Sequence, residues 1–495
     1  MTDRVDASAQ SARAVRNTIS MVLSRIAIAV MGWAGTVIIA RMLSPDEWGK
    51  FSFIFGVLGL MSIITDLGVG RVVLARLVDG EDDDERGRVA TSFIALRLLL
   101  GLAGYVVAVL FVLLSGYSAH VVWATVVAGL VVVISTPSHA LTVMYQSRLR
   151  LTYVAAAEML GQLVQLVFTI LAALVAPILI VFVIPAIANE VVGIVAKLRG
   201  LRDGRLGPNP TGRLEVWRWK EMLLEAVPLS IGFAFIEMTS KIDLVMLAHL
   251  DTFESVGLYS IGYKFADFVL VFALAVVTPF TTVMVASWPR DPAGFRHAVH
   301  RATAIIAVLC AAGTAAFWPS AENLLSLLYG ERFAAAAFST KLMVIGACLA
   351  ALAQLGLMAL VSAGRHRVYP WASLLALGVN VILNLILIPR FSYHGAAWAT
   401  LVSSAVLVIA ISAVLRGSVD IPGVLPLRPL LGTCVITAVV ITVSAVTPAI
   451  NGAPWLAVAL GNAAVTMLLA HAFGFTGGLS FRQLLAHNTS RTGGS

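Results

Sequence analysis

Fourteen long apolar stretches follow one another through this 495-residue chain, and they constrain its fold more than any other feature. A helix of about 20 residues crosses the ~30 Å hydrocarbon core of a bilayer. The stretches are apolar on every face and do not alternate with period two, which indicates α-helices and not the strands of a β-barrel. The expected spans are 18–40, 49–70, 89–114, 119–142, 153–175, 177–198, 222–248, 256–286, 299–319, 338–362, 368–389, 395–415, 428–447 and 454–474.

The composition indicates that lipid is the main solvent of the chain. Hydrophobic residues make up 59% of the sequence and charged residues 12%, and the mean hydropathy is +0.93. A soluble protein of this size cannot hide so much apolar surface, which excludes a cytosolic enzyme, a secreted disulfide scaffold and a disordered protein. The three cysteines lie in apolar runs without the spacing of a metal or disulfide site, so we expect no bound metal.

The distribution of Lys and Arg predicts the orientation of the spans. With the N-terminus inside, twenty-five basic residues fall in inside segments and five in outside segments. This bias is typical of cytoplasmic loops, and it accounts for the net charge of +8 without nucleic-acid binding. We therefore expect a multi-pass membrane protein with both termini in the cytoplasm.

A basic segment rich in Gly and Pro, 199–221, divides the chain into two parts. Six spans precede it and eight follow, so a repeat of the first six spans would be parallel. Two expected outside hairpins share a loose pattern: LSPDEWGKFSF contains Gly49, and LDTFESVGLYSIGYKF contains Gly257. We predict an N-terminal lobe (1–198), a cytoplasmic hinge (199–221), a C-terminal lobe (222–415) and two extra spans with a tail (416–495).

Several ionisable and polar side chains lie inside the expected spans, where an unpaired charge costs about 2.5–3.5 kcal/mol. Four are cations, which we interpret as substrate-binding groups of an aqueous cavity: Arg25, Arg97, Lys241 and Lys264. We interpret the other polar candidates as groups that line this cavity or that couple transport to H⁺ or Na⁺. They are Glu158, Gln162, Gln165, Glu237, Asp267, Asn380 and Asn384. Many of them repeat at helical spacing and form stripes. The alternative is that these charges form structural ion pairs.

Motifs of soluble-enzyme chemistry are missing from the sequence. It contains no Walker motif, GxSxG, HExxH or Rossmann fingerprint. The acidic run Asp82–Asp84 is more typical of a solvated loop than of a transferase site. We therefore expect a protein that is not an enzyme and needs no cofactor, although a membrane-embedded glycan polymerase or ligase stays as a less favoured alternative.

Five segments together resemble the polysaccharide and O-antigen flippases of the multidrug/oligosaccharidyl-lipid/polysaccharide (MOP) exporter superfamily. They are ARMLSPDEWGKFSF (40–53), TDLGVGR (65–71), KIDLVMLAHLDTFESVGLYSIGYKFAD (241–267), LYGERFAAAAFSTKLM (328–343) and NVILNLILIPRFSYHGAAWATLVSS (380–404). The likeness extends through twelve spans. Each motif is loose by itself, but their order and spacing are specific.

The resemblance implies an all-α, MATE-like fold of two six-helix lobes that alternate access to a central cavity. It implies a flippase of the bacterial plasma membrane for an undecaprenyl-diphosphate-linked oligosaccharide or polysaccharide repeat unit, with the cavity cations on the diphosphate. Membrane lipids, a glycan polymerase and other envelope-assembly proteins are the partners to expect. A lipid II flippase and an ion-coupled multidrug exporter of the same superfamily remain open as alternatives.

Overall fold

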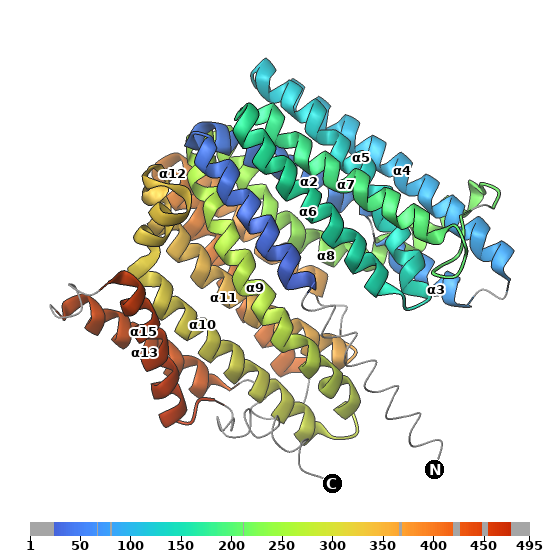
Figure 1. Ribbon diagram of the computed structural model, residues 1–495. Coiled ribbons are helices and arrows are strands. Elements are labelled where there is room, and N and C mark those ends of the chain that lie inside the picture. Colours follow the sequence, from blue (N-terminus) through green and yellow to red (C-terminus); the bar gives the residue numbers. More distant parts are fainter. Residues whose placement is uncertain are drawn as a thin grey trace, which may run out of the picture. The chain divides into compact units, whose positions relative to one another are not determined.

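The computed structural model of the chain consists of helices joined by short connections (Figure 1). The residues it describes are 24–66, 68–79, 82–210, 212–365, 369–418, 426–447 and 454–476. Within those ranges the chain forms two compact units, Met1–Gly257 and Leu258–Ser495. The all-helical fold predicted from the sequence is confirmed.

The helices agree with the predicted spans one by one. Eleven described helices are long and apolar enough to cross a membrane. One of them, Pro370–Gly417, contains the two predicted spans 368–389 and 395–415. The helices α2 and α8 occupy two further predicted spans. Each of the fourteen predicted stretches therefore coincides with helix in the described part of the chain.

The first unit contains eight helices among its described residues, before α9 begins. Their bounds are Ser24–Met42, α2 Pro45–Asp66, α3 Val69–Asp79, α4 Asp83–Leu114, α5 Ala119–Ser147, α6 Leu151–Val175, α7 Leu179–Leu201 and α8 Trp217–Leu250. The short helix α3 lies in a segment that the sequence had indicated only as an inside loop. The helix α8 packs against α2, α3 and α4.

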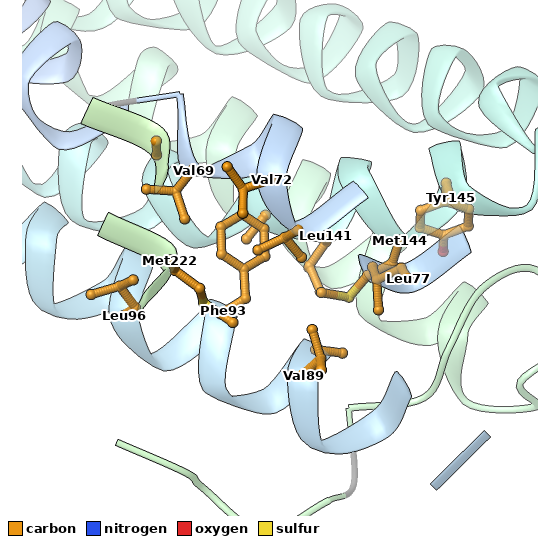
Figure 2. Close-up of a cluster of buried hydrophobic side chains, with 14 of the residues drawn as sticks. Val69, Val72, Leu77, Val89, Phe93, Leu96, Leu141, Met144, Tyr145 and Met222 are labelled. Atoms are coloured by element: carbon orange, nitrogen blue, oxygen red, sulfur yellow. The ribbon is translucent and has the colours of Figure 1, made fainter. Parts of the chain in front are cut away.

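A buried apolar cluster holds the end of the first unit that is predicted to face the cytoplasm (Figure 2). Phe93 of α4, Leu141 and Met144 of α5, and Val72 of α3 converge in it. Met222 of α8 enters the same cluster. The first turns of α8 are thus part of the core of the first unit, and the predicted lobe boundary at 199–221 stays a prediction.

The second unit contains most of α9 and all later helices. Their bounds are α9 Phe253–Ser287, α10 Pro292–Tyr329, the 3₁₀ helix η1 Glu331–Ala336, α11 Ala337–Ser362, α12 Tyr369–Ser418, α13 Leu427–Val446 and α15 Trp455–Ala472. The long element α12 is broken at Ser392, whose φ of 55° and ψ of −142° are not helical. This break lies between the two spans that the sequence predicted there.

The last two helices, α13 and α15, pack against α10 (Figure 1). Asn462 of α15 donates hydrogen bonds to the carbonyl oxygen of Ala315 (3.2 Å) and to Ser444 Oγ of α13 (3.1 Å). Side-chain amides that bond across helices are used in membranes because lipid offers no alternative partner. One amide therefore joins three helices of the second unit.

Candidate functional site

Arg25 and Glu158 form an ion pair between the first described helix and α6. The Arg25 Nη1 to Glu158 Oε2 distance is 3.2 Å. The arginine side chain is 59% exposed and the carboxylate 27% exposed. Both residues were predicted as cavity groups, and the structure brings them together. The pair is open on the arginine side, so the guanidinium can accept another anion.

The predicted polar stripe on α6 continues from Glu158 toward the other end of the helix. Gln162 lies against Gly32 of the first described helix, since a Cβ on that glycine would be 3.6 Å from Gln162 Nε2. Gln165 Oε1 accepts a hydrogen bond from Asn189 Nδ2 of α7 at 2.8 Å. The stripe therefore lies between two neighbouring helices, and one of its amides is already bonded to protein.

Lys197 of α7 belongs to the same region, although sequence reasoning had counted it with an inside segment. It is 3% exposed, and its Nζ donates to Ser138 Oγ of α5 at 3.1 Å. Its charge interacts with those of Glu158 and Glu190. Glu190 and Lys197 are seven residues apart on α7 and share a face, a spacing that could have indicated the lysine from the sequence.

Arg97 is buried in the first unit and binds protein groups on two helices. Its Nη1 lies 2.6 Å from Asp66 Oδ1 and 2.8 Å from the carbonyl oxygen of Thr65, both at the end of α2. Its Nε donates to the carbonyl oxygen of Thr136 on α5 at 3.3 Å. The guanidinium is 3% exposed. Arg97 thus joins α2, α4 and α5, and its predicted contact with substrate stays a prediction.

Lys241 and Glu237 lie one turn apart on α8. The aliphatic stem of Lys241 packs on α2, where a Cβ on Gly59 would be 3.7 Å from its Cγ and Cδ. Lys241 is partly buried and Glu237 is exposed. A long basic side chain in a membrane protein buries its methylenes in this way.

In the second unit, Asn380 and Asn384 form a fully buried polar pair on the first arm of α12. Asn384 Nδ2 donates to Asn380 Oδ1 at 3.0 Å, and Asn380 Nδ2 donates to Ser403 Oγ on the second arm at 3.4 Å. The pair therefore links the two arms of α12.

Lys264 and Asp267, both on α9, complete the predicted set. Lys264 is partly buried, whereas Asp267 is exposed. Among the residues that the structure describes, no group of three or more His, Cys, Asp or Glu side chains is arranged to hold a metal ion.

The sequence profile of a family described as polysaccharide biosynthesis protein matches residues 38–338, more than half of the chain. This chain belongs to that family. The match contains α2 to α10, and therefore Lys241, Lys264 and the stripe on α6. A comparison with curated protein sequences found no match.

The solved structures that are similar to this chain are transporters and flippases. The lipid II flippase MurJ, in an inward closed conformation, is 14% identical, covers 94% of this chain and all of its own, and has a TM-score of 0.74. An inward-facing multidrug resistance MATE transporter of the MOP superfamily is 15% identical. The match covers 79% of this chain and 96% of the transporter, with a TM-score of 0.63. A MOP superfamily transporter from Pyrococcus furiosus is 14% identical. The match covers 81% of this chain and 95% of the transporter, with a TM-score of 0.57.

These similarities confirm the fold predicted from the sequence. Because all identities are below 25%, they concern the architecture and not the cargo. Together with the family match, they also confirm the resemblance to MOP-type polysaccharide flippases that the sequence motifs indicated. The chain is a multi-pass membrane protein with the MOP fold.

Proposed function

We propose that this protein is a flippase for an undecaprenyl-diphosphate-linked oligosaccharide or polysaccharide repeat unit. It acts in the bacterial plasma membrane, with both termini in the cytoplasm, and turns its cargo from the inner to the outer leaflet by alternating access. The family match and the MOP fold support a transport role in glycan assembly. The cargo proposal rests on the ion pair of Arg25 and Glu158, in which the arginine side chain stays exposed.

The pair suits a diphosphate because Arg25 is held in place but not covered. A guanidinium binds phosphate oxygens through two parallel N–H bonds, and phosphate carries more charge than a carboxylate. The diphosphate therefore displaces Glu158 from Arg25 when it enters. A ligand that binds one lobe arrangement better than the other shifts the population toward that arrangement. The lipid tail stays in the bilayer throughout.

Displacement also gives Glu158 a role in energy coupling. Without Arg25 beside it, a carboxylate in a region of low dielectric takes up a proton or binds Na⁺. Gln162 and Gln165 offer neutral acceptors next to it on α6. The proposal therefore places H⁺ or Na⁺ coupling at Glu158. Delivery of the glycan to a polymerase at the outer surface completes the cycle, with no cofactor required.

The test is a set of Arg25 variants in the native host. Arg25→Ala is expected to accumulate the lipid-linked precursor on the inner leaflet at wild-type protein levels, whereas Arg25→Lys retains part of the export. Arg205→Ala, which removes an exposed arginine of the linker, serves as the matched control. Normal export by Arg25→Ala would reject the diphosphate role of this residue.

The alternative cargo that the sequence left open is lipid II, the cargo named for MurJ, whose fold this chain shares. The two cargoes share the undecaprenyl diphosphate and differ in the glycan. Reconstituted vesicles loaded with either lipid separate the two proposals by which one is translocated. Export of a cationic dye in place of both lipids would instead support the multidrug exporter.

A further inference from the structure

A polar cavity of about 680 Å³ lies at the end of the first unit that is predicted to face the cytoplasm. The start of α4, the α5–α6 turn and the α7–α8 linker enclose it. Its lining residues are Asp83, Asp84, Gly87, Arg88, Arg148, Gly204, Pro208, Asn209, Gly212, Arg213 and Glu215. This volume is in the range of small-molecule sites. None of the residues assigned to transport above belongs to the lining.

The linker that covers this cavity is held against the first unit at several points. The backbone N–H of Glu215 donates to Ser92 Oγ at 2.9 Å, and Trp219 Nε1 donates to the Ser92 carbonyl oxygen at 2.9 Å. A Cβ on Gly212 would lie 2.5 Å from Arg88 N, so only glycine allows this approach. The wall of the cavity is therefore built by tertiary contacts and is not a loose loop.

The three arginines of the lining come from three separate segments and differ in their ion pairs. Arg148 Nη2 lies 3.0 Å from Asp83 Oδ1, a carboxylate that also binds Arg86. Arg88 Nε lies 3.5 Å from Glu215 Oε1, a carboxylate that also binds Arg218. Arg213 is exposed and has no ion pair with a carboxylate in the described part of the chain. The arginines can therefore bind an incoming anion, Arg213 most directly.

The polar groups on the same walls restrict the class of anion. Asp84 and Asn209 provide oxygen and amide groups of the kind that bind sugar hydroxyls through hydrogen bonds. Arginines provide the planar N–H pairs that match phosphate oxygens. A ligand with phosphates and adjacent hydroxyls can bond to the arginines and to the Asp84 and Asn209 groups at once. A simple anion has no hydroxyl for Asp84 and would be repelled by its carboxylate.

We propose that this cavity binds a glycosyl diphosphate from the cytoplasmic side, with Arg88, Arg148 and Arg213 on the diphosphate and Asp84 and Asn209 on the sugar. The same chemistry occurs in a soluble nucleotide sugar and in the head of a lipid-linked glycan. The cavity does not include Arg25, so this binding proposal can be tested independently of the proposed transport pathway.

The test measures binding of UDP-glucose to the purified full-length protein in nanodiscs by isothermal titration at fixed ionic strength. Saturable binding is expected for the wild type. Arg213→Gln is expected to weaken binding about tenfold or more, because it removes a charge-assisted contact. Arg205→Gln, which removes an exposed linker arginine outside the cavity, is expected to leave binding unchanged. Equal losses in the two variants, or no saturable binding by the wild type, would overturn the proposal.

The Asp84→Asn variant tests the contact of Asp84 with the sugar. Inorganic diphosphate, which has no sugar, serves as the second probe. The variant is expected to weaken UDP-glucose binding and not diphosphate binding, and an equal effect on both probes would contradict the role of Asp84.

A competition experiment shows whether the natural ligand is soluble or lipid-linked. Undecaprenyl diphosphate is added to the nanodisc as a competitor of UDP-glucose, and binding is measured in the Arg25→Ala variant. Displacement of UDP-glucose supports a lipid-linked ligand, and absence of displacement supports the soluble one.

Discussion

Gly49 of α2 and Gly257 of α9 pack backbone to backbone. A Cβ on Gly49 would lie 2.9 Å from Gly257 N, and a Cβ on Gly257 would lie 3.2 Å from Gly49 N. The contact is reciprocal, because each added Cβ would also overlap the carbonyl oxygen four residues before the other glycine, that of Phe253 or Pro45. These are the two glycines that the sequence placed at equivalent positions of a repeat.

We predict that Gly49→Ala destabilises the protein, because the new methyl group would overlap backbone atoms that cannot move aside cheaply. Overpacking of this kind costs about 1–3 kcal/mol or more. Gly257→Ala should have a similar effect, since the contact is symmetric. Thermal unfolding in detergent measures both changes. The matched control is Gly313→Ala in α10, where the Cβ would meet nothing within 4 Å. Because Ala is the better helix former, Gly313→Ala should leave the stability unchanged or raise it. A loss of stability in this control as large as in Gly49→Ala would contradict the role of the glycine contact.

A second prediction concerns Arg97. Arg97→Met keeps the length of the side chain but leaves two carbonyl oxygens and Asp66 without their donor. We expect a loss of about 2–4 kcal/mol of unfolding free energy, at the lower end because the Asp66 side chain is 62% exposed and stays solvated. Chemical denaturation and export are measured on the same variant. If export falls while stability is unchanged, Arg97 acts on the substrate as the sequence suggested, and the structural role is contradicted.

A third prediction concerns the buried amides of α12. Asn380→Leu removes the bond to Ser403 and leaves the amide of Asn384 without its acceptor. We expect a loss of about 1–3 kcal/mol, because an unsatisfied polar group cannot reach water inside the bundle. The double variant Asn380→Leu/Asn384→Leu is the control. It should recover part of the stability, since the second substitution removes the amide that lost its bond to Asn380. A double variant less stable than the single one would argue against this pairing.

The positions of the spans and the family were accessible to sequence reasoning, because they depend on local composition. A stretch of about 20 apolar residues must form a helix in lipid, whatever its neighbours are. Helical spacing likewise placed Glu158, Gln162 and Gln165 on one face of α6. The turn at Ser392 was bracketed correctly by the two spans around it.

The partners of the charged groups were decided only by the tertiary structure. Arg97 and Arg25 both lie in predicted spans, yet Arg97 is buried against carbonyl oxygens of α2 and α5, whereas Arg25 pairs with Glu158 and is 59% exposed. The linker arginine Arg213 meets Arg88 and Arg148 in one cavity across long sequence separations. The sequence by itself determined which segments enter the membrane, since burial in lipid is a property of each segment. Which charge is paired, buried or open depends on packing between helices, and no single segment contains that information.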